Sequence, residues 1–367
     1  MEVIKRIETR RGANLNINGI AEKILDKNLS VNTYGLRPDD FFGTTPKLCL
    51  KEGSNILAGT PVFYSKKTPD VKIVSPVSGT IKKIIRGPKR KIENIIIESS
   101  KKQESIVHEV KGWNKMNIDD LKQLLMESGN WSFIHQRPYG IMANPLDTPK
   151  SIFVSTAKTD PLHEDYHFVL KDDQKEFQLG IDLLNRLVDQ SVFLGLDKSF
   201  PGYFESIEGV QHYSFKGPHP AGNLSLHIQK LCPLNMNDRV WTVNPEDVVN
   251  IGRFISSGVF SPQRTVAVSG NAVENPKYFR TKIGAELAPI LNKVGIKFDN
   301  VRVINGDVLT GSTALISEYL GYFNNLVTVI PEGSYYRMFG WLPFKDNKIL
   351  SLSNTSLSRL FNRKGFE

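Results

Sequence analysis

The loop Gly217-Pro218-His219-Pro220-Ala221-Gly222 is the segment whose residue types and spacing are best suited to chemistry. Its two prolines fix the backbone and its two glycines permit unusual dihedral angles, so the loop presents the imidazole of His219 rigidly. The histidine is either a hydrogen-bond donor to a polar ligand or a structural residue bonded within its own turn. His212 and His227 lie at spacings that fit no common metal-ligand pattern, so no metal site is expected.

A second candidate is the segment 129–140, which follows a predicted helix as a phosphate-binding loop would. Such loops need glycines so that backbone N–H groups can approach a phosphate closely. Here only the first and last residues are glycines, and bulky side chains that include Trp131, Arg137 and Tyr139 lie between them. A tight nucleotide cradle is therefore not expected. The glycine-bounded segment 306–311 is interpreted as a tight turn, with an anion nest as the alternative.

The stretch Ser75–Ile81, preceded by Gly59–Phe63, resembles the biotinyl and lipoyl carrier fold. Carriers present one lysine at a hairpin tip, and the corresponding hairpin here is Lys66–Asp70. The carrier position falls near Thr68, beside Lys67, and the flanking carrier motif is absent. We therefore interpret this module as a carrier fold reused for docking.

Composition limits the classes of function further. The cysteines Cys49 and Cys232 are too few for an iron–sulfur or structural zinc site, and we interpret both as small buried hydrophobic residues. The net charge is +9, and the cations of 86–91 lie in a turn without interleaved aromatic residues. This pattern favours a solvated basic hairpin, facing an acidic partner or anionic lipid, over a nucleic-acid-binding surface.

No apolar run approaches the roughly 20 residues of a membrane-spanning helix, and the N-terminus lacks the apolar centre of a signal peptide. We expect the chain to stay in the cytoplasm unless a partner holds it at a membrane.

Periodicity divides the chain into modules. Short strands and frequent turns over 31–112 predict a small, nearly closed β module. A strand–helix–strand unit in 113–258 predicts a parallel α/β sheet. Strands around one short helix in 259–330 predict a β-grasp-like module. Residues 1–30 are expected to pack on the other modules, and 331–367 begin a C-terminal region.

Helical spacing of apolar residues places the main helices, and Asn117 is the expected N-cap of the first. The expected helices are 119–128, 175–187, 247–258 and 285–293. The expected strands of the second and third modules are 151–155, 191–196, 264–269, 278–283, 301–304 and 326–330.

Taken together, these stretches closely resemble the A subunit of the bacterial sodium-translocating NADH:quinone oxidoreductase, the NqrA family. The motifs that carry the resemblance are Tyr34–Pro38, Pro76–Gly79, Arg137–Tyr139, Ile152–Val154, Gly217–Gly222, Gly306–Gly311 and Phe339–Trp341. They span essentially the whole chain, and the 217–222 segment is highly specific. The family continues into a C-terminal helical region, so the end at Glu367 is expected to be a truncation.

The resemblance implies a peripheral subunit on the cytoplasmic face of the bacterial inner membrane. Its partners would be the other subunits of a pump, membrane subunits included, that passes electrons from NADH to ubiquinone and exports sodium; nucleic acid is not an expected partner. The implied fold class is α/β plus β, with a biotinyl/lipoyl-like β barrel, a Rossmann-like α/β domain and a β-grasp (SLBB-like) domain. The chain would be an enzyme as a subunit of NADH:ubiquinone reductase, and the isolated chain is not expected to be catalytic.

The family is also similar to the flavin-bearing subunit of respiratory complex I and to the C subunit of the Rnf complex. Those relatives use a glycine-rich loop for flavin mononucleotide, whereas the matching stretch here is 129–140, so no tightly bound cofactor is expected. Ubiquinone is the expected ligand, contacted by Trp131, Arg137, Tyr139 and His219 where the fold brings their two loops together. No catalytic residue or metal ligand is assigned. The alternative is a stand-alone flavin- or NADH-dependent oxidoreductase.

Overall fold

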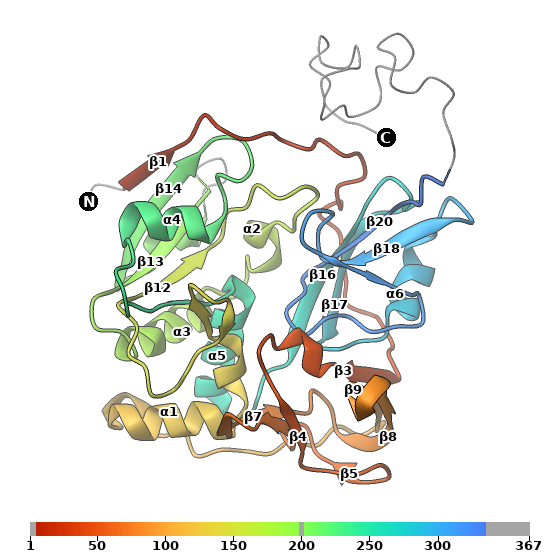
Figure 1. Cartoon of the computed structure of the whole chain (residues 1–367), viewed down its shortest axis with the longest axis horizontal. Coiled ribbons are helices and arrows are strands. Elements are labelled where there is room, and N and C mark those ends of the chain that lie inside the picture. Colours follow the sequence, from red (N-terminus) through yellow and green to blue (C-terminus); the bar gives the residue numbers. More distant parts are fainter. Residues whose placement is uncertain (1–4, 198–201, 335–367) are drawn as a thin grey trace.

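The computed structural model describes residues 5–197 and 202–334, which form four β-sheets of seven, six, four and three strands. Figure 1 shows the seven-stranded sheet with its helices on the left, the six-stranded sheet on the right, and the two small sheets below them. No helix among these residues is long and apolar enough to cross a membrane.

The two small sheets make up the first module. The four-stranded sheet has the order β3 (Thr33–Leu36), β9 (Ile92–Ser99), β8 (Gly79–Arg86), β5 (Asn55–Ile56). The three-stranded sheet has the order β4 (Pro46–Leu48), β6 (Pro61–Ser65), β7 (Thr68–Val74). Short 3-10 helices occupy Pro38–Asp40 (η1) and Pro88–Arg90 (η2). Alternate side chains such as Val71 and Ile73 are buried between the sheets, as the predicted strands require.

The cysteine prediction is half wrong. Cys232 is buried at the end of a helix, but Cys49 is exposed. Cys49 follows β4, an edge strand of the three-stranded sheet, and although its backbone N–H donates to the carbonyl of Val62 on β6, the residue is exposed at this edge. No disulfide links the two.

The seven-stranded sheet has a parallel centre, as predicted. Its order is β1 (Lys5–Glu8), β14 (Val210–Lys216), β13 (Ser191–Leu196), β12 (Ser151–Ser155), β15 (Val240–Thr242), β10 (His135–Arg137), β11 (Ile141–Met142). The first five strands are parallel to one another, and β10 and β11 add an antiparallel edge. All five residues of β12 are buried, which is typical of a strand with both faces covered.

The helices of this module follow the predicted periodicity closely. They are α1 (Ile118–Glu127), α2 (Tyr166–Val169), α3 (Gln174–Arg186), α4 (Leu224–Leu231) and α5 (Pro245–Ser257), with 3-10 helices η3 (Trp113–Lys115), η4 (Asn130–Phe133) and η5 (Tyr203–Ser206). The side chain of Asn117 caps α1 by accepting the backbone N–H of Asp120 at 2.8 Å, so the predicted N-cap is confirmed. The strand β14, the strand β15 and the helix α4 are not among the predicted elements.

The six-stranded sheet belongs to the third module and packs on one helix. Its order is β19 (Ser312–Ala314), β18 (Val301–Asn305), β20 (Leu326–Pro331), β16 (Gln263–Ser269), β17 (Lys277–Lys282), β2 (Leu25–Asp26). The predicted strands 264–269 and 278–283 correspond to β16 and β17, which pair antiparallel, and the predicted short helix is α6 (Leu287–Val294).

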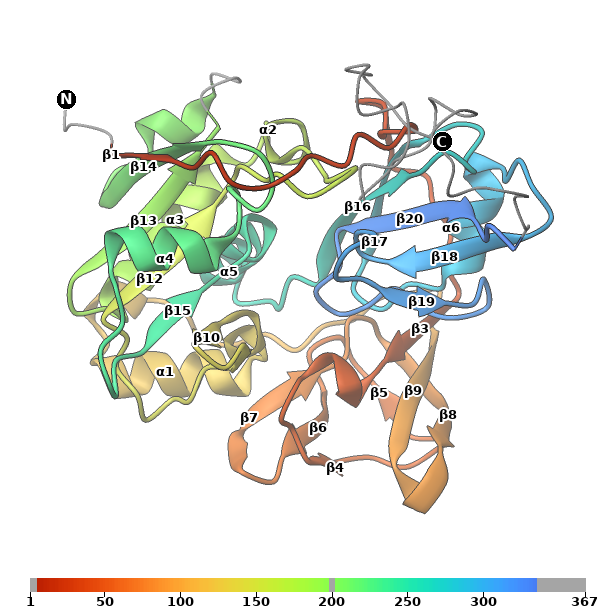
Figure 2. The ribbon, with the colours of Figure 1, turned by 45° about the horizontal axis from the view of Figure 1, so that its top comes forward.

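The N-terminal segment contributes to two sheets. β1 pairs in parallel with β14 of the α/β module, and β2 pairs in parallel with β17 of the third module. Figure 2 shows this segment, in red, running across the top of the molecule from one module to the other. The segment carries no recognisable motif. A short strand that is added to the edge of another module's sheet needs little hydrophobic periodicity of its own.

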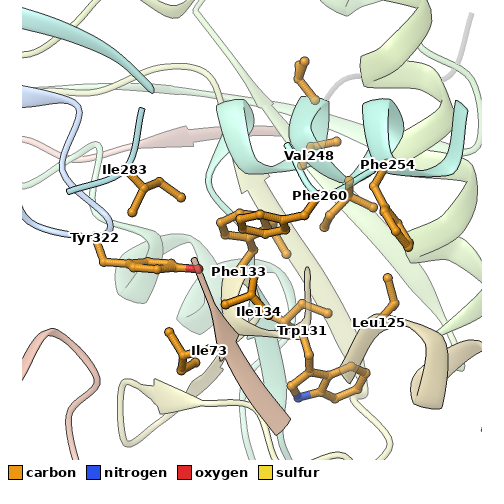
Figure 3. Close-up of a cluster of buried hydrophobic side chains, with 14 of the residues drawn as sticks. Ile73, Leu125, Trp131, Phe133, Ile134, Val248, Phe254, Phe260, Ile283 and Tyr322 are labelled. Atoms are coloured by element: carbon orange, nitrogen blue, oxygen red, sulfur yellow. The ribbon is translucent and has the colours of Figure 1, made fainter. Parts of the chain in front are cut away.

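The modules share one apolar core. Phe133 of η4 stacks on Phe260 at a centroid distance of 5.7 Å and lies 6.2 Å from the ring of Tyr322, which belongs to the third module. Figure 3 shows these rings together with Ile73 of the first module and Val248 and Phe254 of α5. Burial of this continuous surface holds the three modules in a fixed arrangement.

Candidate functional site

The four residues predicted to contact a quinone do not share one pocket. Arg137 pairs with Val240, the first residue of β15, so it lies at the amino ends of the parallel strands. His219 follows the last residue of β14 and lies at the carboxyl ends. Three strands lie between β10 and β14, so four inter-strand spacings of roughly 4.8 Å each, about 19 Å in all, separate the two strands. The condition on which the four residues were candidates for one site, that the fold brings the two loops together, is not met.

Trp131 belongs to the core rather than to a surface. Its side chain is fully buried, its indole N–H donates to the carbonyl of Ala143 at 2.8 Å, and its ring meets Trp241 edge-on at 5.3 Å. Gly129, at the start of the same segment, packs so closely that an added Cβ would lie 2.5 Å from a methyl group of Val74. The segment predicted to match a flavin loop is thus closed by packing and offers no cradle for a phosphate.

Arg137 and Tyr139 lie at the outer edge of the sheet. Arg137 is half-buried, its bond to Pro138 is cis, and burial lowers the pKa of its guanidinium. Tyr139 is 61 % exposed, and the guanidinium of Arg239 lies 5.6 Å from its ring centre. These two side chains line a surface rather than an enclosed pocket.

His219 is bonded within the protein. Its Nδ1 lies 3.2 Å from the hydroxyl of Thr159 and 3.5 Å from a carboxylate oxygen of Asp160. Its backbone N–H donates to the side chain of Asn14 at 2.9 Å. The loop that carries His219 therefore connects the N-terminal segment with the loop after β12, which lines the first of two pockets.

This first pocket is a polar cavity of about 250 Å³ where the three modules meet. From β12 the chain reaches β13 on one side and later β15 on the other, so the strand order reverses between β12 and β15. Ligands of open α/β sheets bind at the carboxyl ends of strands at such a reversal. The cavity lies there, lined by Lys158, Asp160 and Glu164 after β12 and by Asn244 after β15.

Both cations of the cavity are paired with a carboxylate. Lys158 Nζ lies 2.6 Å from Glu164 Oε1, which also accepts the hydroxyl of Tyr166 at 2.7 Å. Burial opposes both charges, but their attraction prevails: it raises the pKa of Lys158 and lowers that of Glu164. From the other modules, Arg37 pairs with Asp40 at 2.9 Å, and Asp307 accepts the backbone N–H groups of its own loop. The predicted tight turn at 306–311 is confirmed.

The cavity is poorly suited to a phosphate. Four carboxylates face two full cations, and an anion is repelled by such a surplus. The N-terminus of α5, which in other α/β proteins can bind a phosphate, is occupied by its own side chains. Asn244 accepts the N–H of Glu246 at 3.0 Å, and Glu246 and Asp247 supply negative charge in the first turn.

The second pocket is a larger groove of about 660 Å³ beside the end of α5. One side is apolar or aromatic, and the residues that form it are Leu29, Tyr34, Val259, Phe260 and Pro262. Burial raises the pKa of Tyr34 to about 12, so its hydroxyl stays protonated and can donate a hydrogen bond.

The other side of the groove is basic. Arg280 and Lys282 lie two residues apart on β17, so both side chains project from the same face of the strand. Within the described part of the chain Arg280 makes no ion pair, and its buried Nε has no hydrogen-bond partner. Lys282 contacts Gln103 at 3.2 Å, and burial lowers the pKa of its amine. An apolar slot with a few convergent donors is the usual form of a small-molecule site.

The sequence pattern identifies neither pocket. Lys158 and Glu164 directly follow a wholly buried predicted strand, which is a usable signal for a site at the carboxyl end of a sheet. Arg280 and Lys282 stand two residues apart in a predicted strand, where cations on one face need a solvent or ligand partner. Nothing in the sequence places either pair beside the residues of the other modules.

Fold and site together define a multi-module protein in which a barrel-like β module, an α/β module and a sheet-and-helix module enclose shared pockets. Three family models match it: the NqrA N-terminal barrel-sandwich hybrid domain over 7–100, the NqrA second alpha/beta domain over 116–260, and the NQRA C-terminal (SLBB) domain over 265–315.

Curated relatives cover most of the chain. The A subunit of the Na(+)-translocating NADH-quinone reductase of Rhodopirellula baltica is 33 % identical over 339 residues, which cover 90 % of this chain and 74 % of the relative. The protein of the same name from Neisseria meningitidis is 31 % identical over 364 residues, which cover 98 % and 81 %. The chain belongs to the NqrA family, whose named members are subunits of an oxidoreductase complex.

Among solved structures, the chain is similar to an NAD+-reducing nickel–iron hydrogenase in its air-oxidized state. That match has a TM-score of 0.40 and 13 % identity, and it covers 63 % of this chain and 52 % of that chain.

Proposed function

We propose that the chain is the A subunit of a Na+-translocating NADH-quinone reductase and acts there as a scaffold that contacts ubiquinone and carries no flavin of its own. In this proposal it sits peripherally on the cytoplasmic face of the membrane, held by the other subunits, membrane subunits included. Support comes from the named relatives, which align with 90 % and 98 % of this chain. The shared core of the three modules suits a rigid scaffold.

The proposal includes the finer assignment of the modules. A Rossmann-like origin of the α/β module is supported by the strand order β14-β13-β12-β15. In this order the chain passes from β12 to β13 and β14 on one side, and then returns to form β15 on the other side of β12. A β-grasp-like third module is supported by a mixed sheet that packs on the single helix α6.

That the chain carries no flavin of its own is supported by the residues at the two places where a flavin phosphate would be expected to bind. The 129–140 segment is filled by Trp131 and Phe133, and its first glycine abuts Val74. The cavity at the strand ends carries a surplus of carboxylates. Electrons would therefore reach the quinone through other subunits.

The observation that carries the ubiquinone contact is the groove beside α5. A quinone head group is a flat, largely apolar ring with two carbonyl acceptors, so it needs an apolar slot and hydrogen-bond donors. Leu29, Val259 and Pro262 line the groove with apolar surface beside the largely buried rings of Tyr34 and Phe260. Arg280 supplies donors without an ion-pair partner among the described residues. We propose this groove as the contact site, in place of a site shared by Trp131, Arg137, Tyr139 and His219.

The test combines two measurements on the purified chain. Its visible absorption should show no flavin band, and titration with the short-chain ubiquinone-1 should quench or shift its tryptophan fluorescence saturably. Arg280→Gln should weaken that binding by roughly tenfold, the worth of one good hydrogen bond to a charged donor. The matched control Arg86→Gln, at an exposed arginine of the first module, should bind as the unchanged chain does.

Three outcomes contradict parts of the proposal. A yellow protein with stoichiometric flavin would favour the stand-alone oxidoreductase. Equal binding by both variants would move the quinone away from the groove. Failure of the tagged chain to co-purify with other reductase subunits would remove the subunit role.

A further inference from the structure

The hairpin of β8 and β9 carries the densest basic surface in the described part of the chain. Six cations lie between Lys82 and Lys91, and all six are exposed. Two of them are paired: Lys82 with Glu98 at 2.9 Å and Lys91 with Asp39 at 2.6 Å. The other four, Lys83, Arg86, Lys89 and Arg90, form no ion pair with any residue between 5 and 197 or 202 and 334.

The turn of this hairpin has a backbone conformation that its residues do not favour. Lys89 and Arg90 both have positive φ, 54° and 60°. Side chains other than glycine are disfavoured there, and neither residue has packing contacts that compensate, because both are exposed. Glycine adopts this backbone conformation more easily. The presence of two long cationic side chains at these positions therefore indicates that their charge has a function.

Little negative charge opposes the cations at the turn. No acidic residue lies between Lys82 and Lys91. The nearest in sequence, Glu93, has its carboxylate turned toward Gly87, where an added Cβ would lie 1.8 Å from Oε1. The four cations without an ion-pair partner among the described residues therefore outnumber the carboxylates beside the turn, and they lie on a two-stranded element at the end of the first module that lies lowest in Figure 2.

We infer that this hairpin surface, formed by Lys83, Arg86, Lys89 and Arg90, binds the anionic face of a phospholipid bilayer. The inference rests on the proposed peripheral location, which it deepens by assigning the surface that faces the lipid. Anionic headgroups attract clustered lysine and arginine residues without requiring a shaped pocket, and an exposed hairpin meets that condition. No aromatic side chains interleave these cations for stacking on bases, so lipid is favoured over nucleic acid.

The positive φ angles allow a variant that removes charge without harming the fold. In Lys89→Gly/Arg90→Gly both residues become the type that the turn prefers, so the hairpin should be retained or stabilised. The matched control is Lys111→Gln/Lys115→Gln, which removes the same charge from two exposed lysines outside the hairpin.

The experiment is co-sedimentation of the purified chain with vesicles of phosphatidylcholine alone and of phosphatidylcholine with phosphatidylglycerol. Binding should require phosphatidylglycerol and weaken with added salt, because screening shortens the reach of the charges. The double glycine variant should partition about 30-fold less strongly, which corresponds to about 1 kcal/mol for each lost cation. The control variant should lose much less.

Equal binding by the glycine variant and the control would overturn the inference, as would binding that does not depend on phosphatidylglycerol. Retention of an acidic protein partner instead of vesicles, lost in the glycine variant, would reassign the surface to that partner and also overturn it. The proposed function would survive each of these results, because co-purification with the reductase subunits is measured separately on the same variants.

Discussion

Arg264 and Asp247 form an ion pair that joins two modules inside the core. Arg264 lies on β16 of the third module, its side chain is fully buried, and its Nη1 lies 2.5 Å from Asp247 Oδ1 on α5. Its Nε and Nη2 donate to the carbonyl of Tyr322 at 3.2 and 3.0 Å. The guanidinium therefore fixes the α/β module, β16 and the loop before β20 in one geometry.

Removal of the arginine should destabilise the protein strongly. In Arg264→Met the carboxylate of Asp247 stays buried without its partner, and such a loss typically costs about 3–5 kcal/mol of unfolding free energy. Urea unfolding followed by far-ultraviolet circular dichroism measures the change. Arg264→Met combined with Asp247→Leu should recover part of the loss, since no unpaired charge remains. A double variant that is no more stable than the single one would show that packing, not the unpaired charge, dominates.

The neighbouring Glu246 should make stability depend on pH. Its Oε2 accepts the backbone N–H of Thr265 at 3.0 Å, while its buried Oε1 has no partner. Burial raises the pKa of this carboxyl above its ordinary 4.5, against the attraction of Arg264. A carboxyl with a raised folded pKa binds its proton more tightly in the folded state. The unfolding free energy should therefore fall as pH rises from about 4.5 through the raised folded pKa.

Glu246→Gln tests this dependence. The amide can still accept the N–H of Thr265 but does not titrate, so the slope of unfolding free energy against pH should become shallower in that window. Asp247, whose pKa burial also raises, should leave a residual slope in the same direction. The matched control is Glu127→Gln on the surface of α1. An unchanged slope in Glu246→Gln would mean that Glu246 is not the titrating group.

The central α/β sheet can be predicted because its signals are local. The compact strand β12 with its apolar centre, the helical spacing of α3 and the capping residue Asn117 each depend on neighbours in sequence, and each prediction agrees with the structure within one or two residues. β1 and β15 escape prediction for the opposite reason. They are short, and their partners lie far along the chain, as in the pairing of Lys5 with Tyr213.

The site is less predictable than the fold. The sequence predicts that 129–140 lacks a phosphate cradle, but it does not predict that Trp131 is a core residue beside Trp241. His219 is the most conspicuous candidate, yet its ring bonds to Thr159 and Asp160. Both pockets are built from residues of different modules, and no spacing along the chain encodes how modules pack. The motif Phe339–Trp341, which contributes to the family resemblance, lies outside the described residues.

The two thiols should differ in reactivity. Cys49 is exposed and Cys232 is buried beside the hydroxyl of Ser151, 3.5 Å away. A maleimide reagent should modify about one thiol per folded chain and both after denaturation, because the reagent reaches an exposed thiol but not a buried one. Mass spectrometry of tryptic peptides identifies the modified residue. Rapid labelling of Cys232 in the folded protein would contradict the packing of α4 on the sheet.

The packing of α3 against α5 should be unusually sensitive to a single methyl group. An added Cβ at Gly252 of α5 would lie 1.8 Å from the carbonyl oxygen of Glu176, and one at Gly180 of α3 would lie 2.1 Å from that of Val248. Because the obstacle is backbone, neither helix can yield by rotating a side chain.

Gly252→Ala should therefore lower the unfolding free energy by about 1–3 kcal/mol or more, although alanine favours helix. Ser256→Ala, exposed on the same helix, should change it by less than about 0.5 kcal/mol. Thermal denaturation that shows Gly252→Ala to be as stable as Ser256→Ala would mean that the two helices do not approach as closely as described. The end of α5, which forms one wall of the groove, would then lie in a different position.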